Sequence, residues 1–229
     1  FIPLVTRPTL PHQSMSSRPA RAMRTKVVWG VLGIGMTLGI GVLSALDSGN
    51  ATRTGGRSLT PLMGIERTVG MESIFQTSNP IEETRWDSIV IVHSGQPAGS
   101  PADIAQEHKS LGYDGLGFHF VIGNGKRMGD GEIHVGYRWL DQQAGADLSG
   151  INSGFNSSNA IEICLVGDGD RRPFSEEQLY RLAQLVDSLS DELGIGADSI
   201  HLHKDLAGTS SPGQFFPRAQ FDDLLASMD

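Results

Sequence analysis

The residues in this chain that are best suited to chemistry are two histidines near its end. His203 begins the segment 203–213, which reads HKDLAGTSSPG, and His201 precedes it by two residues. If that stretch is extended, both side chains lie on the same face. Imidazole nitrogens bind zinc well, and carboxylates such as Asp147 or Asp205 can complete a site. A metal site is therefore one interpretation, and a pair of hydrogen-bonded loop histidines is the structural alternative.

The elements that would position these residues are visible in the pattern of apolar residues. Short runs rich in β-branched residues predict buried strands over 89–92 and 161–166. Apolar residues at helical spacing predict a helix over 175–193, which begins after Ser175 and stops at Gly194. A second amphipathic stretch covers 101–111. Strands alternating with helices predict an α/β fold, with a mixed central β-sheet flanked by helices.

The segment 203–213 resembles the one that closes the zinc site in type 2 N-acetylmuramoyl-L-alanine amidases and peptidoglycan recognition proteins. There it usually reads His-Arg-Asp, a short spacer, then Thr-x-Cys-Pro-Gly. The resemblance runs from about residue 86 to 217, and its most specific part is GYDGLGFHFVIGNG at 112–125. It implies the amidase fold, zinc as cofactor, cleavage of the amide between N-acetylmuramic acid and L-alanine, and peptidoglycan as the partner.

The same resemblance implies that the zinc site is degenerate. The family's first ligand position falls on Val92, the second on His203 and the third, usually cysteine, on Ser211. A neutral hydroxyl is a poor zinc ligand beside a thiolate or an imidazole. The family tyrosine whose hydroxyl assists the reaction falls on Phe118. A single retained ligand, His203, is not expected to hold zinc.

Other cleft positions follow from the resemblance. The family's Gly-Ala-His histidine falls on Asp147, and Asn152 is assigned to the cleft. Thr209, which keeps a residue type common in recognition proteins, is assigned with Phe118 to the catalytic positions. His93 would occupy the first ligand position after a shift of one residue. Because side chains alternate along a strand, Val92 and His93 cannot both face the cleft without a bulge.

Four other features are interpreted as structural. His119 and His134 lie in strand-like segments and receive no catalytic role. Cys164 is the only cysteine, so it forms no intrachain disulfide, and it is expected to be a small buried apolar residue. The sequence DGD at 168–170 lacks the rest of a calcium loop and predicts a turn.

The amino-terminal part predicts a membrane anchor. Residues 27–46 contain no charge and are about long enough to cross a bilayer. The basic segment 1–26 would then lie in the cytoplasm and the rest of the chain outside it, with the protein in the cell membrane. A cleaved signal peptide, followed by secretion or periplasmic release, is the alternative. Residues 47–85 predict a flexible linker, and 86–229 the amidase-like domain.

Charge narrows the range of partners. The chain has 26 acidic and 18 basic residues and a formal net charge of −8 at pH 7. An acidic chain of this kind argues against nucleic acid as a partner. Two main functions remain. One is a membrane-tethered, non-catalytic module that binds peptidoglycan. The other is an active zinc amidase with its ligands regrouped around His203 and His93. A gene product that has lost both functions is a third possibility.

Overall fold

The computed structural model describes residues 56–59, 70–82, 84–146, 148, 151 and 154–228. The expected cytoplasmic segment 1–26 and the expected membrane span 27–46 lie outside these residues, as do the cleft candidates Asp147 and Asn152. Within the described part of the chain, no helix combines the length and the apolar character that crossing a bilayer requires.

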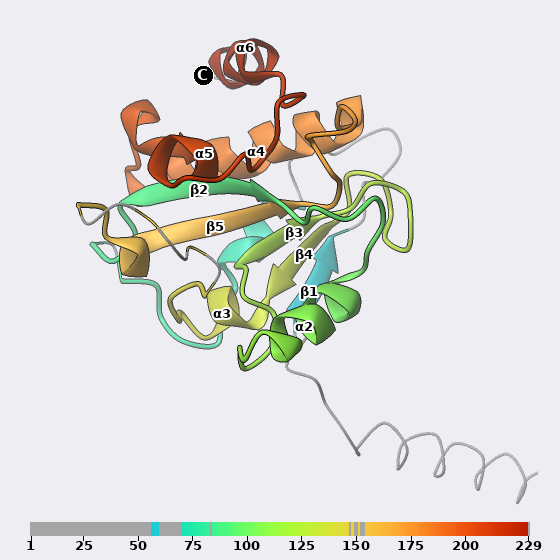
Figure 1. Cartoon of the computed structure of the whole chain (residues 1–229). Coiled ribbons are helices and arrows are strands. Elements are labelled where there is room, and N and C mark those ends of the chain that lie inside the picture. The colour runs from blue at the N-terminus through green and yellow to red at the C-terminus, as the bar shows by residue number, and fades with distance from the viewer. Residues whose placement is uncertain are drawn as a thin grey trace, which may run out of the picture. The chain divides into compact units, whose positions relative to one another are not determined.

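One six-stranded sheet forms the centre of the domain (Figure 1). Its strands in chain order are β1 (Gly56–Leu59), β2 (Ser88–His93), β3 (Phe120–Ile122), β4 (Ile133–Gly136), β5 (Ala160–Leu165) and β6 (Ile200–Leu202). Across the sheet they lie in the order β1-β4-β3-β5-β2-β6. β2 is parallel to β5 and β6, and β3 is parallel to β5. β4 is antiparallel to β3 and β1, which confirms the predicted mixed sheet.

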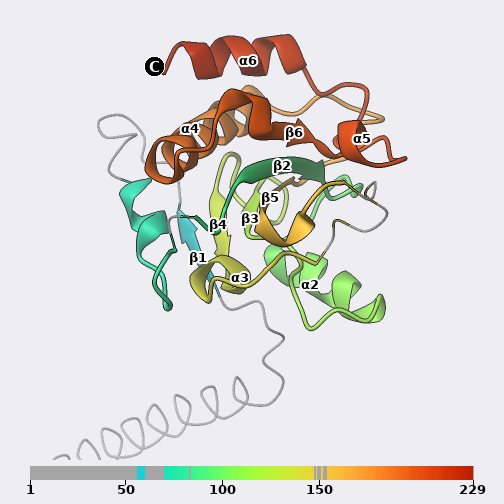
Figure 2. The same ribbon diagram turned by 90° about the vertical axis from the view of Figure 1, so that its left-hand side faces the viewer.

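Helices cover both faces of this sheet, as predicted. In chain order they are the 3-10 helix η1 (Glu72–Phe75), α2 (Pro101–Ser110), α3 (Tyr137–Leu140), η2 (Ser157–Asn159), α4 (Glu176–Leu193), η3 (Ala197–Ser199), α5 (His203–Leu206) and α6 (Arg218–Ala226). Figures 1 and 2 show α4 and α6 on one face of the sheet and α2 and α3 on the other.

α4 forms where its local signals predict it. The Ser175 hydroxyl accepts a hydrogen bond from the Gln178 amide, and Gln178 Oε1 accepts one from the Ser175 amide, which makes a capping box. The helix stops at Gly194, whose φ of 68° is a left-handed conformation that glycine adopts without strain. Between these ends, Leu182 and Val186 are fully buried, and each such side chain contributes roughly 1.5–3 kcal/mol of hydrophobic stabilisation.

The sheet separates two apolar clusters, and β2 contributes to both. Ile89 and Ile91 belong to the larger cluster, which also contains the buried face of α4. Val90 and Val92 belong to the smaller one, together with Ile104 of α2. Because strand side chains alternate between faces, this pattern also determines where the last residue of the strand, His93, is directed.

The predicted flexible linker 47–85 differs from the structure in two places. The backbone of β1 pairs with β4 along four residues, from Gly56 opposite Gly136 to Leu59 opposite Ile133. Ile74 is fully buried in the larger cluster, and its carbonyl accepts a hydrogen bond of 2.7 Å from Trp139 Nε1. The segment carries no long periodic pattern because it contributes one short edge strand and one helical turn. These parts belong to the folded unit.

Candidate active site

His93 lies at the carboxyl end of β2, where three separate segments of the chain meet. Its main-chain amide donates a hydrogen bond to Ser211 Oγ at 3.0 Å, and its ring nitrogen Nδ1 accepts one from the Gly169 amide, also at 3.0 Å. Since Nδ1 accepts a hydrogen bond, a neutral ring carries its own hydrogen on Nε2. His93 therefore connects the loop after β5 to the loop after α5.

These two loops are also fastened directly to each other. The Asp170 carboxylate accepts hydrogen bonds from the Ser210 hydroxyl and from the Gln214 amide, the latter at 3.2 Å. The Gly169 carbonyl accepts from the Phe215 amide at 2.8 Å. Gly213 permits this approach because its φ is 105° and because a Cβ there would lie 2.0 Å from the Gly169 carbonyl carbon. We call this set of contacts the loop latch.

His203 is the second imidazole of the site. It is the first residue of α5 and is buried, with an exposed fraction of 8%. Its Nε2 has no hydrogen-bond partner among the described residues. Burial lowers the pKa of His203, and the neighbouring His93 lowers it further. A buried polar nitrogen without a partner is costly, which marks this atom as one that a ligand would satisfy.

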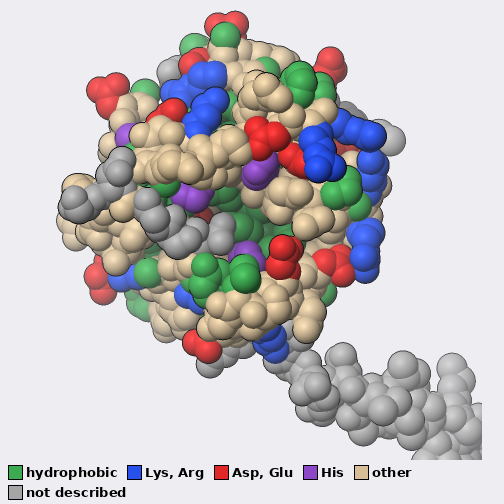
Figure 3. All heavy atoms as spheres, viewed as in Figure 1, with side chains coloured by type: hydrophobic (Ala, Val, Ile, Leu, Met, Phe, Trp, Pro, Cys, Tyr) green, Lys and Arg blue, Asp and Glu red, His purple; other side chains and the backbone are tan. Residues whose placement is uncertain are grey.

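The surroundings of His93 include groups that lower its pKa and groups that raise it. Burial lowers its pKa, whereas the carboxylates of Asp170 and Asp168 and a hydrogen bond to the Pro212 backbone act to raise it. The net shift is downward, so both His93 and His203 favour the neutral form near pH 7. Histidine side chains surround a hollow on the face seen in Figure 3.

Two residues that the sequence assigns to the cleft, Val92 and Phe118, are buried among apolar side chains. Val92 has an exposed fraction of 1% and Phe118 of 2%, and both lie in the smaller apolar cluster with Ile104. The Phe118 ring packs edge-on against His108, with ring centroids 4.9 Å apart. Because residue 93 ends the strand at the loop latch, the structure places His93, in place of Val92, beside His203. This is the placement that the shift of one residue requires, and a metal-binding role for His93 stays a prediction.

The serine expected at the third ligand position does lie in the site. Ser211 is buried, and its hydroxyl accepts the bond from the His93 amide. Its own amide donates to Thr209 Oγ1 at 3.2 Å, and its carbonyl accepts from the Lys204 amide at 2.7 Å. Thr209 is exposed, so its part in this structure is to hold the Ser211 backbone.

The remaining histidines have structural surroundings. His119 is fully buried, with its Nε2 at 2.9 Å from the Gln143 carbonyl and its Nδ1 accepting from the Glu162 amide at 2.9 Å. His134 is buried in β4. His201 packs edge-on against Phe155, with centroids 5.6 Å apart, and shares no described contact with His203.

The predicted turn at 168–170 contributes more to the site than its residues alone indicate. The turn itself is confirmed, since Asp168 Oδ1 accepts a hydrogen bond from the Asp170 amide at 3.2 Å. Gly169 of this turn, however, donates a hydrogen bond to His93, and Asp170 accepts one from Ser210 in the loop latch. The segments around Gly169 and Gly213 lie far apart in the chain, and neither carries a local pattern that predicts their contact.

The described donors do not match what a catalytic zinc needs. Such an ion takes about three protein ligands, commonly imidazoles, thiolates or carboxylates. Here the third donor is the Ser211 hydroxyl, and the Nδ1 lone pair of His93 is directed at the Gly169 amide. No group of three histidine, cysteine or acidic side chains with metal-binding proximity occurs among the residues that the structure describes.

Comparison with known proteins agrees with this fold. The sequence model of the N-acetylmuramoyl-L-alanine amidase family matches residues 82–214. An endolysin amidase, LysCS from Clostridium intestinale URNW, is 23% identical with a TM-score of 0.51, over 66% of this chain and 90% of that one. AmpD, solved as a selenomethionine derivative, is 17% identical with a TM-score of 0.50, over 62% and 86%.

No curated protein sequence matches the chain. The two structural likenesses lie below 25% identity and support the fold alone. The family match, in contrast, spans more than half of the 229 residues, including β2, β5 and the loop latch up to Gln214. The chain therefore belongs to the N-acetylmuramoyl-L-alanine amidase family.

Proposed function

We propose that this protein binds peptidoglycan in the cleft beside His93 and His203 without hydrolysing it. The observation that carries the proposal is that the atoms in the cleft that could bind a metal are weak ligands or are already hydrogen-bonded. Ser211 supplies a neutral hydroxyl that already accepts a hydrogen bond from the His93 amide, and Gly169 occupies the Nδ1 lone pair of His93. A catalytic zinc activates water only when protein ligands hold it, and this donor set is short of three.

An active zinc amidase is the second candidate, and two observations favour it. His93 and His203 lie together and are biased toward the neutral form, which is the form that binds metals. His203 Nε2 is buried without a partner among the described residues. On this candidate, a third ligand would have to come from outside the described residues, where Asp147 is the acidic residue that the family pattern indicates.

The proposal includes a location. The uncharged run 27–46, preceded by the basic segment 1–26, is the basis for a single-pass membrane anchor with the amidase-like domain outside the cytoplasm. Signal-peptide cleavage and release of the domain is the alternative. Mass spectrometry of the mature amino terminus in membrane and soluble fractions distinguishes the two, because only cleavage removes residues 27–46.

Zinc stoichiometry tests the main proposal. The sample is the full chain, since a piece beginning at residue 82 would lack β1 and the buried Ile74. After incubation with excess zinc and removal of free ion, elemental analysis is expected to find far less than one zinc per chain. One zinc per chain, lost in His203→Ala, would establish the amidase candidate instead.

Two assays on purified sacculi complete the test. The full chain should co-sediment with sacculi to the same extent with and without a chelator, because binding does not depend on metal. Mass spectrometry of the supernatant should detect no released stem peptides, even with added zinc. Chelator-sensitive release of stem peptides would contradict the proposal, and failure to co-sediment would remove its binding half.

A further inference from the structure

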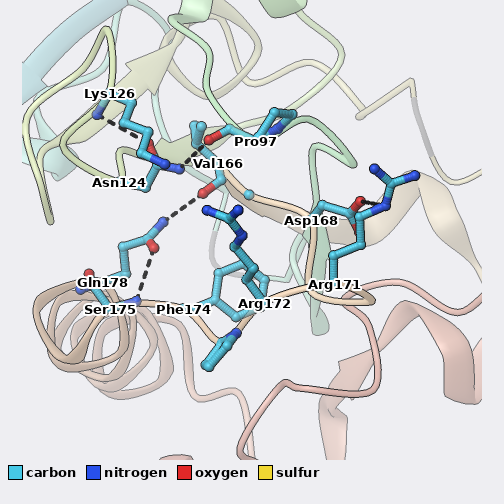
Figure 4. Close-up of a pocket in the computed structure, with 12 residues that line it drawn as sticks. Pro97, Asn124, Lys126, Val166, Asp168, Arg171, Arg172, Phe174, Ser175 and Gln178 are labelled. Atoms are coloured by element: carbon cyan, nitrogen blue, oxygen red, sulfur yellow. Dashed lines mark hydrogen bonds and ion pairs between the residues drawn. The ribbon is translucent and has the colours of Figure 1, made fainter.

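A second cavity, of about 460 Å³, lies beside the loop that carries Asp168 and is separate from the histidine site (Figure 4). Its lining includes Lys126, Arg172, Val166 and Phe174, and none of His93, His203 and Ser211 belongs to it. The cavity is adjacent to the cleft, because the same loop contacts His93 through Gly169 and lines the cavity through Asp168.

The lining carries an excess of positive charge. Arg171 is paired with Asp168 over 3.1 Å, and Figure 4 shows it turned toward that carboxylate. Arg172 and Lys126 are exposed and form no ion pair with any described residue. In Figure 4 the Arg172 guanidinium lies among the lining side chains. Two unpaired cations around a hollow, on a chain of net charge −8, favour an anionic ligand.

The cavity walls are rigid and partly apolar. Val166 is fully buried and Phe174 nearly so. Gln178 Nε2 donates to the carbonyls of Val166 at 3.0 Å and Ile122 at 3.2 Å, and Asn124 Nδ2 donates to Pro97 at 3.2 Å. Both amide groups are thus engaged in holding the walls. The groups left for a ligand are the two cations and the apolar surface.

The volume excludes a bare ion as the best occupant. A water molecule takes about 30 Å³ in the liquid, so a small ion would leave most of this cavity to solvent. An amino acid residue that carries both an aliphatic side chain and a free carboxylate fits better. Its carboxylate can pair with the guanidinium fork of Arg172 and the ammonium of Lys126, while its alkyl group covers the exposed ring of Pro173 beside Phe174.

We propose that this cavity binds the carboxyl-terminal residue of a peptide through its free carboxylate. The proposal rests on the proposed function, because peptidoglycan supplies such peptide ends on its stems. A stem peptide lying along the loop 167–172 would contact the histidine cleft with one end and this cavity with the other. The loop is suited to that role, since the Gly167 amide donates to Ser94 Oγ at 3.0 Å and fixes the loop to the strand that bears His93.

The experiment compares two probes that differ in one group. Calorimetric titration of the full chain with muramoyl pentapeptide as the free acid, and with the same peptide as its carboxyl-terminal amide, should show roughly tenfold tighter binding of the acid. Arg172→Gln combined with Lys126→Gln should abolish the difference. Arg172→Lys keeps the charge without the fork and should retain part of it.

Lys109→Gln is the matched control. Lys109 is an exposed cation near the end of α2 that forms no ion pair with a described residue and lies outside the cavity. Its replacement should leave the preference for the acid unchanged. Thermal unfolding of every variant checks that the fold is intact, which surface substitutions of this kind are expected to preserve.

The outcomes are distinct. Equal affinity for acid and amide, with sacculus binding retained, would overturn the carboxylate pocket and leave the proposed function standing. A third outcome is that neither peptide form binds, whereas inorganic phosphate binds in a way that depends on Arg172. The ligand would then be a phosphate, which also overturns the assignment. Loss of the acid preference in Lys109→Gln would show a general charge effect. Failure of the full chain to bind sacculi would reject the proposed function and, with it, this use of the cavity.

Discussion

The main-chain amide of Gly169 donates a hydrogen bond to Nδ1 of His93 across 76 positions of sequence. This contact determines which histidine nitrogen carries the proton and directs the ring at the loop after β5. It also occupies the lone pair that a metal would need. The chemical state of the cleft therefore depends as much on a glycine backbone as on the histidines themselves.

The loop latch makes Gly213 sensitive to substitution. Gly213→Ala should lower the free energy of unfolding by about 3 kcal/mol, because it combines a positive φ with a Cβ in contact with Gly169. Chemical denaturation measures the change. Gly208→Ala is the matched control, since a Cβ at Gly208 meets nothing within 4 Å. Similar losses in both variants would show that the latch does not stabilise the fold.

Zinc binding should be recoverable with one substitution, with zinc displacing the Gly169 amide from His93 Nδ1 so that three ligands are reached. Ser211→Cys places a thiol beside His93 and His203, and a thiolate competes for zinc far better than a hydroxyl. We expect elemental analysis to rise toward one zinc per chain, and to fall again when His203→Ala is added. Val92→His should gain no zinc and should destabilise the domain, because that side chain lies in the apolar cluster. Zinc uptake by Val92→His alone would contradict this assignment.

His119 should make stability depend on pH. Burial lowers its pKa from 6.5 to about 3, so between these values the unfolded chain binds a proton that the folded chain does not. The free energy of unfolding should therefore decrease as the pH falls from 6.5 toward 3, by about 1.4 kcal/mol per pH unit from this group. Urea denaturation at several pH values should give a shallower slope for His119→Gln than for the native chain. An unchanged slope in His119→Gln would mean that this ring is protonated in the folded state.

Ile74 tests where the domain begins. Ile74→Ala should cost about 3 kcal/mol, the usual range for removing a fully buried aliphatic side chain. Ile81→Ala, at a partly buried residue of the same segment, should cost clearly less. Denaturation midpoints of the two variants provide the readout. A negligible effect at Ile74 would restore the interpretation of the segment as a linker.

The features that the sequence predicts are those held by residues close together in the chain. The ends of α4 were predictable, because the capping pair of Ser175 and Gln178 and the stop at Gly194 are local signals. The choice between Val92 and His93 was not, because it depends on where β2 ends and on contacts with Gly169 and Ser211. Side-chain alternation limited the choice to one of the two without saying which.

The difference between local signals and long-range contacts also explains why β1 and Ile74 were included in the predicted linker. Ile74 is held by Trp139, 65 positions away, and β1 is held by the backbone of β4. Neither segment is long enough to show a helical or strand period of its own. Family resemblance could indicate His203 and Ser211 together, since the motif that carries them is contiguous, and their role in a site stays a prediction.

The loop latch joins the end of β2 to residues 210–215, so the cleft is completed only by the last part of the chain. During synthesis, His93 leaves the ribosome long before the segment that must close over it. A molecule truncated after β6 can therefore pair β2 with both of its neighbouring strands without offering a complete binding site. Because the proposed ligand would bind only the finished fold, each tenfold excess of ligand over its dissociation constant would add about 1.4 kcal/mol to the free energy of unfolding. Occupied molecules would then resist proteolysis better than empty ones.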